Sequence, residues 1–371
     1  MDLDLAADTL AFRDEVRAFL RENVRPLPSM DTPEGFEAHR EWEHQLAEAG
    51  LSVVSWPAAY GGRDATLEQW VVFEQEYYRA RAPLRVSQNG IFLLAPTMFA
   101  HATAEQLARI MPPMARADEI WAQAWSEPEA GSDLAGIRSR AVRTDGGWLL
   151  SGQKAWSTRA TYADRGFGLF RTDPDAERHR GLTYFLFDLR ADGVSVRGTA
   201  QLDGEPGFAE IFLDEVFVPD ADVLGAVGDG WRVAMSTASN ERGLSLRSPG
   251  RFLAAADRLV ELARSCNDTA LTDRVVDAWI GARAYELHTW ATVTRLSSGG
   301  ALGAESSAGK LFWSQLDVAL HETALDLQGA HGEVVDDWTA GYLFALAGPI
   351  YAGTNEIQRN VVAERLLGLP R

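Results

Sequence analysis

The chain has 371 residues, of which 46% are hydrophobic, and it contains twelve Trp and sixteen Phe. This length and composition exclude a disordered or low-complexity protein and predict a large core shared by two or three structural regions. The formal net charge of −18 argues against a nucleic-acid backbone or an anionic membrane as partner, although a local arginine cluster could still bind a small anion.

Helical patterns fill the first third of the chain. Apolar residues recur at helical spacing from Phe12 to Leu20, and the stretches 37–50, 65–81 and 103–118 are rich in strong helix formers. The start MDLDLAADTLAFRDEVRAFL is acidic and amphipathic, which is not the layout of a signal peptide. Together with the single cysteine, Cys266, and the lack of an apolar run of about 18 residues, this predicts a cytoplasmic protein without a membrane span.

Short strand-like runs separated by turn residues extend from about residue 119 to 218. The segment SRAVRTDGGWLLSG predicts a hairpin with Asp145-Gly146-Gly147 as its turn. From Gly230 the helical patterns return, over 250–266, 271–297, 304–328 and 355–367. We therefore predict an α+β protein with an N-terminal helical domain over 1–118, a middle antiparallel β-barrel domain over 119–225 and a C-terminal helical bundle over 226–371.

Several familiar catalytic motifs are missing from the sequence. No Gly-x-Gly-x-x-Gly follows a strand, and neither a phosphate-binding P-loop nor a Gly-x-Ser-x-Gly nucleophile elbow occurs. His321-Glu322 begins like a zinc-binding helix, but Leu325 stands where the second His would be needed. We therefore predict no metal site.

Three polar segments remain as candidates for a ligand site. SEPEAGSDLAG, residues 126–136, offers backbone N–H groups and a hydroxyl suited to a phosphate or a ring carbonyl, but a plain turn would look the same. In SGQKAWSTRA, residues 151–160, Trp156 is either ordinary barrel packing or a platform for a flat cofactor. In the tail IYAGTNEIQRN, Thr354 or Asn355 can cap a helix whose first N–H groups suit a phosphate or a flavin carbonyl.

The order of these segments resembles the acyl-CoA dehydrogenase family. The resemblance is carried by SEPxAGSD, GWxLxGxKxWxT, FxExxFxxVxVPxxxxLG and the terminal IYxGTxEIQRxxxAExxLGLP. It implies a helix–barrel–helix layout, bound FAD, a tetramer or other oligomer, and α,β-desaturation of an acyl-CoA thioester. Such a reaction needs a base for the α-proton, hydrogen-bond donors on the thioester carbonyl, and a flavin that accepts the β-hydride.

The resemblance also implies which residues contact FAD. Ser126 and Thr158 would hydrogen-bond to the flavin ring, Trp156 would pack on it, and Glu356 would lie on the ribose or adenine side. The full predicted set is Trp125, Ser126, Gly131, Ser132, Trp156, Thr158, Thr354 and Glu356. Trp125 and Gln123 depart from the small or aromatic residues that are commoner there, which implies a differently shaped flavin pocket.

The catalytic base is not at its commoner place. Many family members carry a Glu directly after the tail Tyr, where this chain has Ala352. A second family location is a Glu just before an Arg on the first long helix after the barrel, which matches Glu241 and Arg242 in SNERG. We predict Glu241 as the base, because desolvation beside an acyl channel would raise its pKa; the alternative is an Arg–Glu pair on a solvated face. Ser132, Ser239 and Arg242 are the predicted substrate contacts.

Two departures keep other functions open. The Arg-x-x-Phe-Gly segment whose Arg reaches a neighbouring subunit's FAD is replaced by ARSCNDTALTDR, and the Gly-rich segment is altered to DLQGAHGEV. The alternatives are a non-catalytic or FAD-poor partner subunit of a heterotetramer, and a flavin-dependent monooxygenase of the same fold. The predicted partners are an acyl-CoA or carrier-bound acyl thioester, an electron-transfer flavoprotein or similar acceptor, and further subunits of a homo- or hetero-oligomeric dimer or tetramer.

Overall fold

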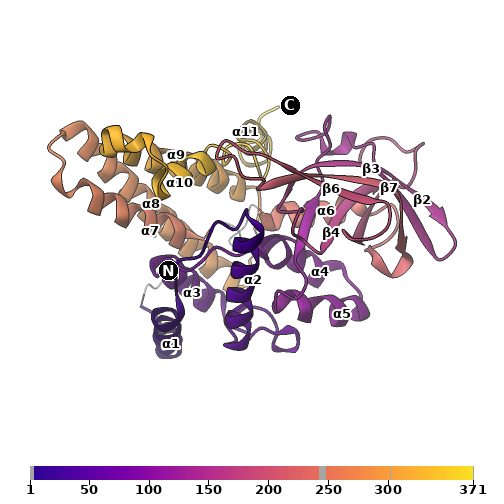
Figure 1. Ribbon diagram of the computed structural model, residues 1–371, viewed down its shortest axis with the longest axis horizontal. Helices are drawn as coiled ribbons and strands as arrows, with labels where there is room; N and C mark the ends of the chain where they lie inside the picture. The colour runs from indigo at the N-terminus through magenta and orange to yellow at the C-terminus, as the bar shows by residue number, and fades with distance from the viewer. Residues whose placement is uncertain (1–3, 242–247, 301, 371) are drawn as a thin grey trace. The chain divides into compact units, whose positions relative to one another are not determined.

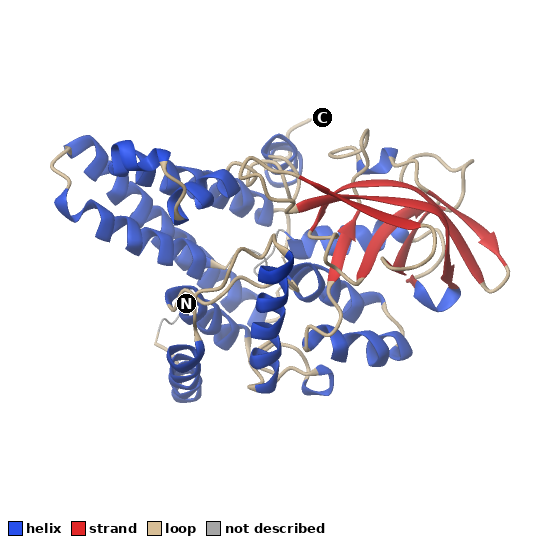
Figure 2. Cartoon of the chain, viewed as in Figure 1, coloured by secondary structure: helices blue, strands red, loops and turns tan. Residues whose placement is uncertain are grey.

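The computed structural model describes residues 4–241, 248–300 and 302–370. Within these ranges a helical stretch, a sheet and a second helical stretch follow one another (Figures 1 and 2), so the predicted α+β class is confirmed. The α-helices are α1 (Ala7–Asn23), α2 (Pro33–Glu48), α3 (Leu67–Arg79), α4 (Ala95–His101), α5 (Ala104–Ala115), α6 (Gly230–Glu241), α7 (Pro249–Leu262), α8 (Thr269–Ser297), α9 (Glu305–Gln328), α10 (Asp337–Ala345) and α11 (Asn355–Val361). The strands are β1 (Trp121–Ala124), β2 (Arg140–Thr144), β3 (Gly147–Thr158), β4 (Arg165–Arg171), β5 (Leu182–Asp188), β6 (Val194–Thr199), β7 (Phe208–Pro219) and β8 (Val223–Leu224).

These elements form two compact units. The sheet unit comprises residues 26–64 and 83–241, and the helical unit comprises 1–25, 65–82 and 242–371. The sheet unit therefore contains the whole sheet together with α2, α4, α5 and α6, whereas α1 and α3 belong with the C-terminal helices. The division of the sequence into domains at residues 118 and 225 stays a prediction.

The sheet is mostly antiparallel and follows the order β6-β7-β3-β2-β4-β5-β8. The expected hairpin joins β2 and β3, with Thr144 paired to Gly147 and Gly146 in the left-handed conformation that its turn requires (φ 70°). Beyond the expectation, β1 pairs with β4 in parallel, which places Ala124 opposite Gly168. A Cβ on Gly168 would lie 2.3 Å from the carbonyl oxygen of Ala124, so the close approach of these strands requires glycine.

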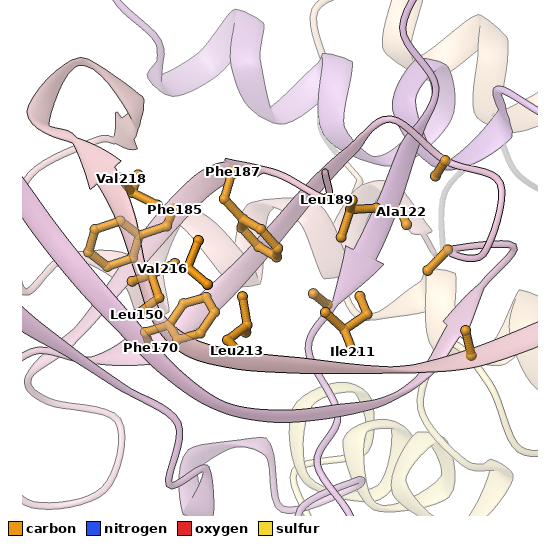
Figure 3. Close-up of a cluster of buried hydrophobic side chains, with 14 of the residues drawn as sticks. Ala122, Leu150, Phe170, Phe185, Phe187, Leu189, Ile211, Leu213, Val216 and Val218 are labelled. Carbon is orange, nitrogen blue, oxygen red and sulfur yellow. The ribbon is translucent and has the colours of Figure 1, made fainter. Parts of the chain in front are cut away.

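The core of the sheet unit lies on the inner face of this curved sheet. Figure 3 shows aromatic and aliphatic side chains from β3, β4, β5 and β7 pointing toward one another. Phe170, Phe185 and Phe187 are fully or almost fully buried, and their rings meet edge to face at 5.8 and 5.9 Å between centroids. This packing holds the strand ends that carry the predicted ligand contacts.

Helices of the sheet unit pack against the sheet through a small polar contact. In α4 the Thr97 hydroxyl lies 2.8 Å from the Thr237 hydroxyl of α6, and Tyr184 on β5 lies 3.4 Å from the same Thr237 oxygen. Residues 89–94 before α4 form one turn of π-helix, a feature that is frequent at functional sites.

In the helical unit, α7, α8, α9 and α10 lie side by side (Figure 1), and α3 packs on α7. Their shared core contains Phe252 and Trp313, whose rings stack at 6.4 Å. An ion pair lies in the same unit, with Arg251 Nη2 donating at 2.8 Å to Oδ2 of the buried Asp317, while the Arg251 side chain is 20% exposed.

Two general features bear on function. None of the described helices combines the length and apolar character that crossing a membrane would require. Among the described residues, no group of three or more His, Cys, Asp or Glu side chains is arranged to hold a metal ion.

Candidate functional site

Two segments that carry predicted flavin contacts meet in the sheet unit. The loop from Ser126 to Gly136 leaves β1, and Trp156 and Thr158 lie at the end of β3. The Ala155 amide donates to the Ser126 carbonyl oxygen at 2.8 Å. The structure therefore joins two segments that lie about thirty residues apart in the sequence, and it places Ser126 beside the strand that carries Trp156.

Trp156 has an unusual conformation for a large side chain. Its φ is 60°, in the left-handed region that bulky residues rarely adopt, and 64% of its surface is exposed. A β-bulge between Lys154 and Ser157 creates this conformation, and the indole contacts Phe208 edge to face at 5.9 Å. The backbone therefore holds an aromatic plane out of the sheet, where ordinary barrel packing would have turned it inward.

Each of the two joined segments also carries a buried donor without a partner in the described part of the chain, Trp125 directly before Ser126 and Ser157 directly after Trp156. Trp125 Nε1 and Ser157 Oγ are both buried and have no hydrogen-bond partner among the described residues. A Cβ added to Gly131 would meet no atom within 4 Å, and Ser132 is exposed, so the loop is open on that side. Because buried polar groups normally find partners, two joined segments that carry an exposed aromatic plane and such donors are compatible with a flat ligand that has polar edge groups, such as a flavin.

The tail segment belongs to the helical unit and is tied down firmly. Lys310 on α9 donates from Nζ to Asn355 Oδ1 at 2.8 Å, and Gln358 Nε2 donates to the Ala352 carbonyl oxygen at 3.0 Å. Thr354 caps α11, with its hydroxyl accepting from the Ile357 amide at 3.3 Å. The expected capping by Thr354 is therefore confirmed, whereas its contact with FAD stays a prediction.

Ala352 and Glu356 have contrasting environments in this tail. Ala352 is 7% exposed and has a φ of 57°, so its methyl group occupies a buried position in the left-handed region. The Glu356 side chain is 77% exposed and pairs at 3.5 Å with Arg359, one turn later on α11. The position after Tyr351 therefore holds no proton-accepting group, as the sequence predicts.

The predicted base is placed only by its backbone. Glu241 is the last residue of α6, and its side chain lies outside the described part of the chain, as do the side chain of Ser239 and the whole of Arg242. The helix itself is anchored in the sheet unit through Thr237. The roles of Glu241, Ser239 and Arg242 stay predictions.

Buried lysines are the residues that the sequence analysis did not single out. Lys154 and Lys310 both have fully buried side chains, and each contacts one of the predicted cofactor segments. Lys154 was visible as part of the GQKAW segment, four residues beyond the inward-facing Leu150. Strand alternation from Leu150 would have predicted its inward orientation, whereas its partner Glu127 could not be read from the pattern.

Comparison with known proteins identifies the class. Models of the N-terminal, middle and C-terminal domains of acyl-CoA dehydrogenases match residues 6–118, 122–216 and 228–367. The chain therefore belongs to the acyl-CoA dehydrogenase family, and it is an oxidoreductase acting on acyl-CoA. These matches confirm the predicted family. Members of this family are flavoproteins.

Individual relatives cover almost the whole chain. The acyl-CoA dehydrogenase IpdE1 of Mycobacterium tuberculosis is 39% identical, with 98% of each chain covered. Among solved structures, the Tcur3481-Tcur3483 steroid ACAD is 25% identical with a TM-score of 0.89 and full coverage of both chains. The ChsE4-ChsE5 complex from Mycobacterium tuberculosis is 26% identical with a TM-score of 0.85, again with full coverage of both chains.

Proposed function

We propose that the chain is an FAD-dependent dehydrogenase that introduces an α,β double bond into an acyl-CoA thioester, with Glu241 as the α-proton base. The observation that supports it most is the hydrogen bond that joins the Ser126 loop to the strand carrying the exposed Trp156. FAD, when bound, supplies the acceptor for the β-hydride. The residues that would hold it are Trp125, Ser126, Gly131, Ser132, Trp156, Thr158, Thr354 and Glu356.

In this reaction the protein's own residues orient the cofactor and the substrate, and one of them moves a proton. Trp156 presents a flat surface, and the Ser126 and Thr158 hydroxyls offer hydrogen bonds to polar edge atoms. Glu241 takes the α-proton, and Ser132, Ser239 and Arg242 bind the substrate. Ala352 leaves the alternative base position empty, so proton transfer depends on the end of α6.

We also propose that the protein works as part of an oligomer. On α8, Val276, Ile280 and Leu287 recur at helical spacing and are each about half exposed, a pattern typical of an interaction surface. Two similar solved structures carry the names of two chains, ChsE4-ChsE5 and Tcur3481-Tcur3483. These names favour a second acyl-CoA dehydrogenase chain as partner. They support a catalytic chain with such a partner and a non-catalytic partner subunit to the same extent.

Reduction of bound FAD by a thioester tests the proposed function. The purified chain, alone and with FAD added, is expected to be yellow and to lose its visible flavin absorbance when mixed without oxygen with a suitable acyl-CoA. The panel should include straight-chain, branched and steroid-side-chain esters, the last because one structural relative is described as a steroid ACAD. FAD that stays oxidised with every thioester, or no FAD uptake, would favour the partner-subunit alternative.

Replacing Trp156 should separate cofactor binding from folding. Because its indole is 64% exposed, Trp156→Ala is expected to leave the melting temperature of the FAD-free protein nearly unchanged. Loss of the aromatic plane should weaken FAD binding about tenfold, corresponding to about 1.4 kcal/mol. Flavin fluorescence titration measures the affinity. Trp279→Ala on α8, where another partly exposed Trp lies, is the control for FAD affinity and should leave that affinity unchanged. An unchanged FAD affinity in Trp156→Ala would contradict the platform role.

A further inference from the structure

Lys154 carries an ammonium group into the interior of the sheet unit. Its side chain is fully buried, and Nζ donates to Glu127 Oε1 and to the Leu169 carbonyl oxygen, both at 2.8 Å. Nζ also lies 4.6 Å from the centroid of the Phe170 ring. The amine therefore links β3 and β4 to the loop that contains Glu127.

Glu127 closes that loop from within. Its carboxylate accepts the Arg138 amide at 2.6 Å and the Ser139 amide at 3.0 Å. Its own backbone exchanges two hydrogen bonds of 3.0 Å with Ala130. One side chain therefore fixes both ends of the segment 127–139, and the lysine fixes that side chain.

A buried ion pair such as Lys154–Glu127 does not by itself indicate a gain in fold stability. The desolvation of two charges commonly offsets their attraction, and apolar replacements of buried pairs are often neutral or stabilising. Burial lowers the pKa of Lys154 to about 8 in spite of the attraction of Glu127. Burial would raise the pKa of Glu127, but the Lys154 ammonium and the Arg138 amide lower it below its usual value. Glu127 therefore stays ionised, and its ion pair with Lys154 fixes the position of the carboxylate.

We propose that Lys154 and Glu127 are positioning residues that set the Ser126–Ser132 loop against Trp156. Glu127 directly follows Ser126, and Lys154 precedes Trp156 by two residues, so the ion pair spans the gap between the two predicted cofactor segments. The inference rests on the proposed function, because it assumes that these segments hold FAD. It adds a specific role to two residues that need not touch the cofactor.

Hydrogen exchange in the FAD-free protein tests the positioning directly. Glu127→Gln keeps the size of the side chain but can no longer accept from both amides while facing the lysine. It should speed amide exchange about tenfold in the segment 126–139 and leave the core strand β5 unchanged. Glu129→Gln is the matched control, since Glu129 lies in the same loop but is exposed and pairs at 2.9 Å with the exposed Arg138 side chain. Unchanged exchange in Glu127→Gln would overturn the inference.

FAD affinity distinguishes positioning from a merely structural role. Glu127→Gln and Lys154→Met should each weaken FAD binding about tenfold and lower the melting temperature, because each leaves one buried charge unpaired. The double variant removes both charges, so its melting temperature should recover while its FAD affinity stays low. Recovery of both quantities together, or normal FAD affinity in the single variants, would overturn the inference. Failure of the unmodified chain to bind FAD would instead contradict the proposed function, and the exchange result would still decide the positioning of the loop.

Discussion

Glu241→Gln is expected to slow the reduction of bound FAD by acyl-CoA by about 10²–10⁴-fold, the usual contribution of a general base. The amide keeps the size of the side chain but cannot take a proton, so FAD and substrate should still bind. The measurement is the rate at which the visible flavin absorbance disappears after anaerobic mixing with a substrate from the thioester panel. A fall in this rate without a fall in FAD affinity would establish the role of α6 in the chemistry.

The control for Glu241 is a carboxylate that has no predicted role. Glu261→Gln on α7 removes an exposed carboxylate that pairs with Arg264 at 2.6 Å, one turn away, and should leave the rate unchanged. If Glu241→Gln reduces FAD as fast as the unmodified chain, Glu241 is not the base. Because Ala352 cannot take the proton, the base would then have to be sought in another residue or a partner subunit.

Asp317→Asn is expected to cost up to about 3 kcal/mol of unfolding free energy, because it leaves the largely buried Arg251 charge without its carboxylate partner. The Asp317 side chain is 1% exposed and accepts from Arg251 at 2.8 Å. Burial would lower the pKa of Arg251, but the attraction of Asp317 raises it, so the arginine stays charged in the folded protein. Urea unfolding followed by circular dichroism measures the change.

A second aspartate on the same helix provides the comparison for Asp317. Asp326 on α9 pairs with Arg274 at 2.6 Å, but both side chains are about half exposed. Exposed pairs contribute at most about 1 kcal/mol, so Asp326→Asn should change the unfolding free energy far less than Asp317→Asn. Similar losses in the two variants would show that burial does not decide the strength of these pairs.

The order of elements could be predicted because it depends on local patterns. The periodic segment predicted over 271–297 corresponds to α8 (Thr269–Ser297), and that predicted over 304–328 corresponds to α9. The turn at Gly146 was readable from its residue types alone. In contrast, the parallel pairing of β1 with β4 depends on a contact between distant residues, which no local pattern contains.

The candidate site was only partly predictable for a similar reason. The motifs named Ser126 and Trp156, but not the backbone hydrogen bond that joins their segments or the left-handed conformation that exposes the indole. A lysine in a strand is usually solvated, so the sequence gives no reason to pair Lys154 with a carboxylate on a distant loop. What sets the geometry of the site therefore lies in contacts between segments.

The conformation of Trp156 also has a consequence for which residues selection would favour at this position. A bulky residue at positive φ costs on the order of 1–3 kcal/mol wherever it occurs, and here the surrounding bulge maintains it at a side chain that is 64% exposed. Glycine would relieve the strain, so selection for stability alone would favour replacing the tryptophan. The presence of tryptophan at this position is consistent with a trade-off between stability and activity. In such a trade-off the strained backbone holds the site in its binding conformation before a ligand binds.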